Sequence, residues 1–247
     1  MIEHIPLLVG AGLLAGAMNA IAGGGSFATF PALVFAGLPP VIANATSTVA
    51  LLPGTLASSW AYREGMTGIG GLPIRALAPI TLVGGLIGAL LLLFTPSPLF
   101  DAVIPWLLLL ATLVFAGGRE LVHAVSGKLH IGKMPVLVAQ FLIAIYGGYF
   151  GGAVGLMMMA VWSLFDAADL KAMAPARTLL TSAANTMAVV CFILAGAVRW
   201  PELAAMLPAV VVGGYLGALG ARYLPPRIVR GAVVVLCAAV TVYFFQR

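Results

Sequence analysis

Ten apolar segments, separated by short polar or glycine-rich stretches, account for most of this chain. They cover residues 5–22, 27–37, 42–62, 72–94, 100–118, 134–150, 156–165, 174–196, 203–221 and 226–245. Segments 27–37 and 156–165 are too short to cross a bilayer, and each follows a glycine-rich break. The others approach the roughly 20 residues that a membrane-spanning helix needs. The pattern therefore predicts an all-α integral membrane protein in which two helices are interrupted.

The first break is Gly23-Gly24-Gly25-Ser26, and the second runs through Gly147, Gly148, Gly151, Gly152 and Gly155. Glycine lets the backbone leave helical angles and lets a ligand approach closely. A half-helix that begins near Ser26 would direct free N–H groups and its positive dipole end into the protein, which suits a desolvated anion. Asn19, just upstream, adds a hydrogen-bond donor. The alternative is a packing kink where two helices approach closely.

The two halves of the chain resemble each other. Residues 79–90 match residues 208–219 at seven of twelve positions, and residues 44–47 fall opposite residues 175–178. Each half then consists of a broken, re-entrant-type helix pair followed by three transmembrane helices. We expect membrane repeats at 1–122 and 134–247, joined by a cytoplasmic linker loop at 123–133. If each broken pair enters and leaves on one side, a repeat crosses three times and the two repeats are inverted.

Composition and charge agree with a multi-pass protein of the cytoplasmic (inner) membrane. Hydrophobic residues make up 62% of the 247 residues and charged residues 8%, too apolar for a soluble core of this size. The twelve Lys and Arg are scattered over short loops with no basic run, so the charge does not indicate nucleic-acid binding. Loops at 63–75, 119–133, 166–177 and 222–230 carry basic residues and are predicted to share the cytoplasmic face.

Polar residues gather at the start of the helix that follows each broken pair. They are Asn44, Thr46 and Ser47 in the first half and Arg177, Thr178 and Asn185 in the second. The hydroxyls and amides can cap a helix or bond between helices, or they can bind a substrate. Arg177 lies about one turn into an apolar segment, where a charge usually faces a cavity or a partner. It is either an anion ligand or a snorkelling residue paired with Asp166 or Asp169.

The apolar segments lack histidines and deeply placed carboxylates, and this excludes several classes of function. The three histidines, at 4, 123 and 130, lie outside them, and no carboxylate lies deep in a span. We therefore expect no metal site and no cofactor. Ser26 has no intramembrane base beside it, so the sequence does not indicate an enzyme. The glycine pairs Gly84/Gly88 and Gly213/Gly217 predict close helix packing or a homodimer through glycine-rich faces.

The sequence resembles the sulfite exporter TauE/SafE family. The resemblance rests on residues 16–33 and 37–47, which contain the glycine triplet and Ala45-Thr46-Ser47, and on residues 147–152, 174–178 and 213–222 of the second half. It implies export of sulfite or short organosulfonates, with site residues at Gly23, Gly24, Gly25, Thr46 and Ser47. The second half departs from a glycine triplet, because Val154-Gly155-Leu156 keeps one glycine and three methionines follow.

We therefore expect a secondary transporter that exports a small sulfur-containing anion, such as sulfite or sulfoacetate, by alternating access. Export of an anion from a cell that is negative inside runs downhill by about 2.3 kcal/mol per charge per 100 mV, which requires no coupling carboxylate. The expected partners are a small anionic substrate and the lipid bilayer. The alternatives are a channel-like anion facilitator or importer on the same scaffold, and a non-transporting membrane assembly subunit.

Overall fold

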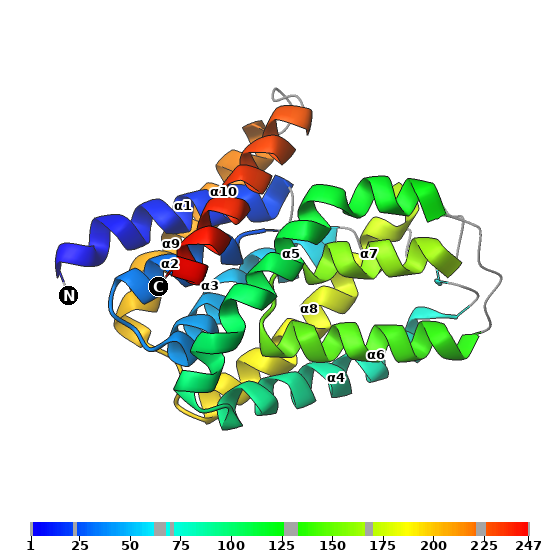
Figure 1. Cartoon of the computed structure of the whole chain (residues 1–247), viewed down its shortest axis with the longest axis horizontal. Helices are drawn as coiled ribbons and strands as arrows, with labels where there is room; N and C mark the ends of the chain where they lie inside the picture. Colours follow the sequence, from blue (N-terminus) through cyan, green and yellow to red (C-terminus); the bar gives the residue numbers. More distant parts are fainter. Residues whose placement is uncertain are drawn as a thin grey trace.

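The computed structural model describes residues 2–21, 24–61, 68–69, 72–125, 133–165, 170–220 and 226–246, and these form a bundle of helices (Figure 1). Apart from one isolated bridge between Ile69 and Leu72, all regular structure described is helical. The elements are η1 (Ile2–His4), α1 (Ile5–Ile21), α2 (Ser26–Phe35), α3 (Pro40–Ala61), α4 (Ile74–Phe94), α5 (Ser97–Val125), α6 (Lys133–Tyr149), α7 (Val154–Phe165), α8 (Leu170–Leu194), α9 (Trp200–Gly220) and α10 (Pro226–Gln246).

The ten predicted apolar segments correspond to these ten α-helices. Pro40 and Pro226 each occupy the first position of a helix, where the missing proline N–H costs no hydrogen bond. Most helix ends agree with the predicted segments to within four residues, and two features differ. Helix α5 continues to Val125, well past residue 118, and Gly147 and Gly148 lie inside α6 instead of in the break that follows it. The second break is therefore shorter than predicted.

Glycines let two pairs of helices approach until their backbones touch. A Cβ on Gly16 of α1 would collide with the backbone of Val210 and Gly214 in α9. A Cβ on Gly88 of α4 would likewise collide with the backbone of Ile145 and Tyr149 in α6. Helices α4 and α6 accordingly lie side by side along the lower edge of Figure 1. The predicted close packing of the glycine faces is confirmed.

Both glycine pairs noted in the sequence pack against helices of the same chain. Gly84 and Gly88 face α6, and Gly213 and Gly217 face α1. These contacts join the first helix of each half to the fourth helix of the other half. A homodimer stays a prediction.

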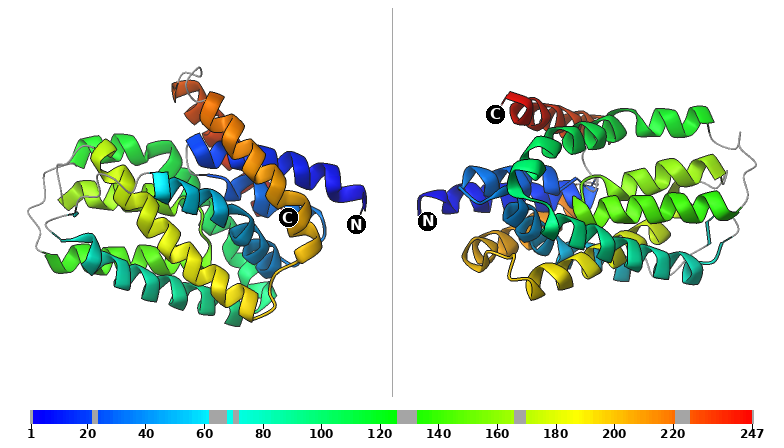
Figure 2. Two further views of the ribbon diagram at one scale, coloured as in Figure 1. Left: turned by 180° about the vertical axis from the view of Figure 1, so that it is seen from behind. Right: turned by 60° about the horizontal axis from the view of Figure 1, so that its bottom comes forward.

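Helices α3 and α8 pack against each other at the centre of the molecule, and Figure 2 shows α8 passing beside α3 and α4. They run in opposite directions, because Ser59 near the end of α3 bonds the carbonyl of Thr178 near the start of α8, at 3.1 Å. The Ser182 hydroxyl lies 2.7 Å from the Ser59 hydroxyl and donates to the Thr55 carbonyl at 2.9 Å. Because these bonds fix which residues of α3 and α8 lie opposite each other, they allow the heights of other residues along the bundle to be compared.

The surface of the bundle is apolar. On α4, the glycine face is buried while Val83, Leu90 and Leu91 are 50%, 39% and 49% exposed. Three described helices are long and apolar enough to cross a membrane, at Ile74–Phe94, Ser97–Gly117 and Pro175–Leu194, and shorter apolar helices accompany them. Side chains of this kind remain exposed when lipid, not water, surrounds them.

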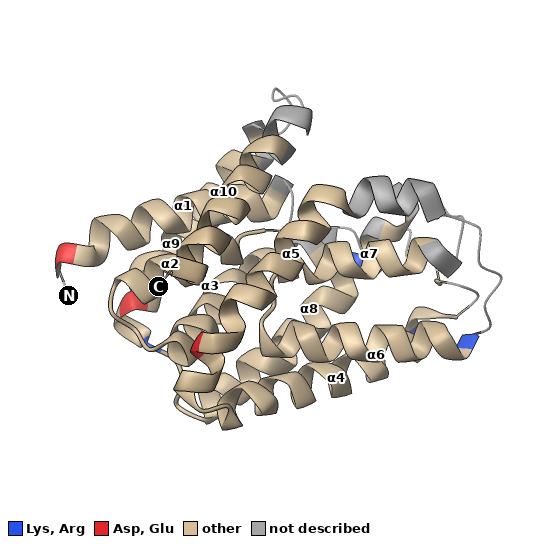
Figure 3. Cartoon of the chain, in the orientation of Figure 1, with Lys and Arg blue, Asp and Glu red and all other residues tan. Residues whose placement is uncertain are grey.

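The described charges lie mainly near helix ends. Arg75 and Lys133 begin α4 and α6, which run parallel; we call this the basic end. Glu3, Asp101 and Glu202 lie in η1, the early part of α5 and the first turn of α9, and we call that the acidic end. Figure 3 shows the red segments toward the side of the N-terminus and most blue segments on the other side. Interior helix segments are thus left almost free of charge, as the sequence predicts.

Candidate functional site

The first break places the start of α2 inside the bundle. Gly25 packs so closely that a Cβ there would lie 2.7 Å from the Ala15 carbonyl and 2.8 Å from Leu51 of α3. Gly24 is covered by the ring of Phe115, which also packs edge-on against Phe27 at 5.8 Å. Both glycines are buried, whereas Ser26 and Asn19 are half-buried. Gly23 lies outside the described residues.

The start of α2 retains unused hydrogen-bond donors. The amides of Phe27, Ala28 and Thr29 donate to the carbonyls of Gly24 and Gly25. The N–H groups of Gly25 and Ser26 have no backbone acceptor within the described part of the chain. No side chain caps this helix start. Free N–H groups at a buried helix N-terminus are the donors that an anion requires.

The second break has a related but distinct geometry. Gly151 and Ala153 both have positive φ, 79° and 59°, and α7 begins at Val154. A positive φ at alanine is sterically costly, so the surrounding packing holds this conformation in place. The amides of Leu156 and Met157 donate to the Ala153 carbonyl, while those of Val154 and Gly155 have no backbone acceptor among the described residues. A second set of free donors therefore lies at the start of α7.

The starts of α2 and α7 lie at similar heights, where height means position along the antiparallel helices α3 and α8. Leu51, which touches Gly25, is one turn from Thr55, whose carbonyl accepts from Ser182. Gly155 lies against Arg177 and Thr181, the latter being the neighbour of Ser182 in sequence. Four residues of α-helix span about 6 Å. The start of α2 is therefore about one helical turn nearer the acidic end than the start of α7.

Arg177 lies directly beside the start of α7. Its Cγ and Cδ atoms are 3.2 Å and 3.1 Å from the position that a Cβ on Gly155 would take. Its Nη1 donates to the sulfur of Met159 at 3.5 Å, and the side chain is half-buried. Thr178, on the neighbouring position, is buried. The alternative partners Asp166 and Asp169 lie outside the described residues.

The polar residues at the start of α3 form a separate group nearer the acidic end. Asn44 donates to the Tyr149 carbonyl at 2.9 Å, and the Thr46 hydroxyl accepts from the Arg199 amide at 3.1 Å. The Ser47 hydroxyl lies 2.6 Å from that of Thr29. All three residues are 2% exposed or less. In this conformation they hold α3 to the second half and to α2.

Asn185 differs from these satisfied residues. Its side chain is 8% exposed, and its Oδ1 has no hydrogen-bond partner. It lies one turn beyond Ser182 on α8, so antiparallel pairing places it level with Leu51 and with the start of α2. Arg177 and Asn185 are eight positions apart on α8, a rise of about 12 Å, so one small substrate cannot contact both backbone positions at once.

The predicted site residues therefore form three groups at different heights. Arg177 and Thr178 lie by the start of α7; Asn19, Gly24, Gly25 and Ser26 lie around the start of α2 with Asn185 at the same height; Asn44, Thr46 and Ser47 lie toward the acidic end. Two sets of free amides and one arginine can replace part of the hydration shell of an anion.

A polar cluster that the sequence analysis overlooked anchors the second half of α7. Gln140 of α6 is fully buried, donates to Thr81 at 2.8 Å and accepts from the indole of Trp162 at 3.0 Å. These bonds connect α4, α6 and α7 through the one side chain of Gln140. The available signal was a lone amide inside the apolar segment 134–150. Such an amide needs partners in a low-dielectric interior.

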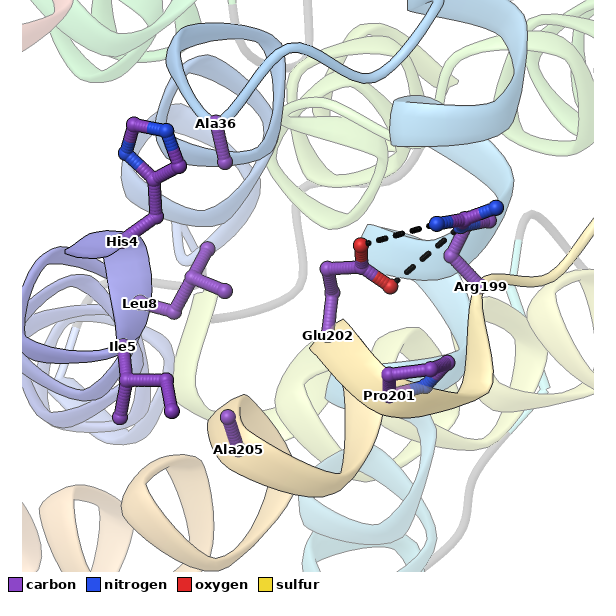
Figure 4. A pocket seen from close by; sticks show the side chains of 8 residues that line it. All are labelled: His4, Ile5, Leu8, Ala36, Arg199, Pro201, Glu202 and Ala205. Carbon is purple, nitrogen blue, oxygen red and sulfur yellow. Dashed lines mark hydrogen bonds and ion pairs between the residues drawn. The ribbon is translucent and has the colours of Figure 1, made fainter. Parts of the chain in front are cut away.

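A pocket of about 310 Å³ opens at the acidic end, away from the half-helix starts (Figure 4). Its lining consists of His4, Ile5, Leu8, Ala36, Arg199, Pro201, Glu202 and Ala205. The buried Glu202 carboxylate accepts from Arg199 at 3.3 Å and 3.4 Å. Because this cation and carboxylate neutralise each other, the pocket offers an anion little net attraction.

Comparisons with known proteins bear on the identity of the chain. The family model described as Sulfite exporter TauE/SafE matches residues 8–244. A protein of Escherichia coli strain K12 named "Probable membrane transporter protein YfcA" is 29% identical over 246 residues, covering 96% of this chain and 89% of the relative. A "Probable membrane transporter protein" of Haemophilus influenzae is 27% identical over 246 residues, covering 97% and 94%. No solved structure matches the chain.

The family match extends over both broken helix pairs and all ten α-helices, and the relatives are similar over nearly their whole length. An apolar exterior and interrupted helices that end inside the bundle are features of many membrane transporters. The chain belongs to the sulfite exporter TauE/SafE family of membrane transporters.

Proposed function

We propose that this protein exports a small sulfur-containing anion, sulfite or a short organosulfonate such as sulfoacetate, across the cytoplasmic membrane by alternating access. The observation that carries the proposal is the pair of half-helix starts beside the central α3–α8 contact, each with two free amides. Donors held rigidly in a dry interior stabilise an anion without the reorganisation that water requires. Arg177 adds a full positive charge next to one of these starts.

Inverted repeats would supply the two states of the transporter. Three features support them: α1 begins at the acidic end and α6 at the basic end, each half has one broken pair, and each half's first helix packs on the other half's fourth. Rocking of one repeat against the other would then expose the half-helix starts to each side in turn.

The three groups of polar residues suggest an order of events for export. An anion arriving from the basic end meets Arg177 and the start of α7 first, and the start of α2 lies one turn further. Beyond it, the bonds of Asn44, Thr46 and Ser47 hold the acidic end together. Release would require these bonds to open. Because the membrane potential favours anion exit, no coupling ion is required.

The proposal is tested by flux in proteoliposomes with an imposed potential, negative inside, loaded with labelled sulfite, sulfoacetate or taurine. We expect saturable efflux and counterflow of at least one anion, and Arg177→Ala lowers kcat/KM about tenfold or more, because a desolvated anion loses a charged partner. Arg177→Lys restores part of the rate, since lysine keeps the charge without the guanidinium fork.

Arg75→Ala provides the matched control, because it removes one exposed positive charge at the same end without touching a half-helix start. We expect it to change flux less than twofold. Flux that does not saturate and shows no counterflow would indicate a channel-like facilitator instead. Absence of flux for every anion, with correctly folded protein, would leave the non-transporting subunit as the better account.

A further inference from the structure

The side-chain oxygen of Asn185 is a buried hydrogen-bond acceptor without a donor, and it lies on α8 where this helix packs against α3. This Oδ1 is buried without a partner, the one such side-chain atom among the described residues. A buried acceptor with no donor is costly, and native proteins rarely retain one without a use. The neighbouring hydroxyls cannot help, because Ser182 is bonded to Thr55 and Ser59, and Ser59 to Thr178.

The acceptor lies on α8 at the height of Leu51, the α3 residue that packs against Gly25 at the start of α2. The Gly25 and Ser26 amides are donors that lack acceptors, and Asn185 Oδ1 is an acceptor that lacks a donor. A ligand that satisfies both must present negatively charged oxygens to one side and an O–H or N–H to the other. A bare sulfonate with an alkyl tail satisfies only the first requirement.

We propose that Asn185 selects substrates that carry a hydrogen-bond donor beside their anionic group, so that the transported species is a hydroxy- or amino-bearing sulfonate, or sulfite in its protonated form. This inference rests on the proposed function and narrows its substrates, because ionised sulfoacetate carries no hydrogen-bond donor. An acceptor that is matched only by the correct substrate discriminates strongly, because the analogue without the donor leaves the acceptor buried and unpaired. Asn185 thus acts as a specificity-determining residue for the site.

The test uses two sulfonates of similar size that differ in one donor, isethionate (2-hydroxyethanesulfonate) and ethanesulfonate, with sulfite as a third anion. In wild-type proteoliposomes we expect kcat/KM for isethionate to exceed that for ethanesulfonate about tenfold or more. In Asn185→Leu, which has a similar size and no acceptor, we expect that ratio to fall to about one.

A second measurement separates this role from a structural one. Asn185→Leu removes an unsatisfied polar atom from the interior, so we expect the melting temperature of the substrate-free protein in detergent to rise or hold while isethionate transport falls. Thr186→Val is the matched control on the next residue, whose hydroxyl bonds only the Ser182 carbonyl of its own helix. It should leave the isethionate-to-ethanesulfonate ratio unchanged.

The comparison of the two anions in wild-type protein can overturn the proposal even if the leucine variant does not fold. Equal transport of both sulfonates would overturn the role of Asn185 while leaving the transporter intact. Absence of saturable flux for all three anions would overturn the proposed function, and this inference with it.

Discussion

At the scale of single residues, buried polar groups in this protein divide into satisfied and unsatisfied ones. Gln140 uses both ends of its amide, toward Thr81 and Trp162, whereas Asn185 leaves its oxygen free. Both are lone amides in apolar helices, so the sequence does not distinguish them. Only the packing of neighbouring helices decides which amide meets partners. The satisfied one stabilises the fold, and the unsatisfied one is available to a ligand.

We predict that Gln140→Leu destabilises the protein by about 1–3 kcal/mol, because the buried Trp162 indole N–H loses its acceptor and the Thr81 hydroxyl loses the bond it accepts. Thermal unfolding in detergent measures the loss. Met134→Ala, at an exposed position of the same helix, serves as the control and should shift the transition little. An unchanged melting temperature for Gln140→Leu would show that the three-helix cluster does not hold α7 in place.

At the scale of helices, the glycines have two uses that look alike in the sequence. Gly24 and Gly25 interrupt a helix, whereas Gly16 and Gly148 remain helical and bring two backbones into contact. Membrane glycines can interrupt a helix or allow two helices to pack closely. The sequence does not distinguish these uses, so Gly147 and Gly148 were predicted to belong to the second break. Apolar length predicted every α-helix to within a few residues, except the end of α5. The positive φ of Ala153 has no sequence signal, because alanine normally favours a helix.

Two glycines on α1 test the packing role directly. A Cβ on Gly16 would meet the backbone of α9, whereas a Cβ on Gly10 meets nothing within 4 Å. We predict that Gly16→Ala destabilises the protein by about 1–3 kcal/mol through overpacking. Gly10→Ala should be neutral or stabilise it by up to about 1 kcal/mol through helix propensity. Equal melting temperatures for the two variants would mean that α1 and α9 do not approach as closely as described.

At the scale of the whole molecule, the described charged side chains lie mainly at the two ends of the bundle. The middle contains the free backbone amides at the starts of α2 and α7. The family, the helical class and the membrane environment follow from apolar length and the glycine motif, and the match to the family model confirms them. The division of the site into three heights was not predictable, because it depends on the antiparallel register of α3 and α8. The bond between Ser182 and Thr55 fixes that register, and hydroxyls recur too often in these helices to indicate it.

The orientation of the repeats gives the last prediction. Glu3 and Lys133 precede or begin the first helix of each half, and both are exposed, at opposite ends of the bundle. In protein whose Cys191 and Cys237 are replaced by serine, we predict that Glu3→Cys reacts with a membrane-impermeant maleimide in intact cells. Lys133→Cys should react only after permeabilisation, since basic residues stay on the cytoplasmic side. Ser97→Cys, which begins α5 after the short turn that follows α4, should behave like Glu3→Cys.

Labelling of Glu3→Cys and Lys133→Cys from the same side would contradict inverted repeats, because equivalent positions would then share one face. Labelling from opposite sides, but with Lys133→Cys reactive outside, would keep the inversion and reverse the protein in the membrane. In that arrangement Arg177 would lie toward the exterior, and an anion from outside would meet it first. The same structure would then be better suited to import, so this experiment bears on the direction of transport as well as on the fold.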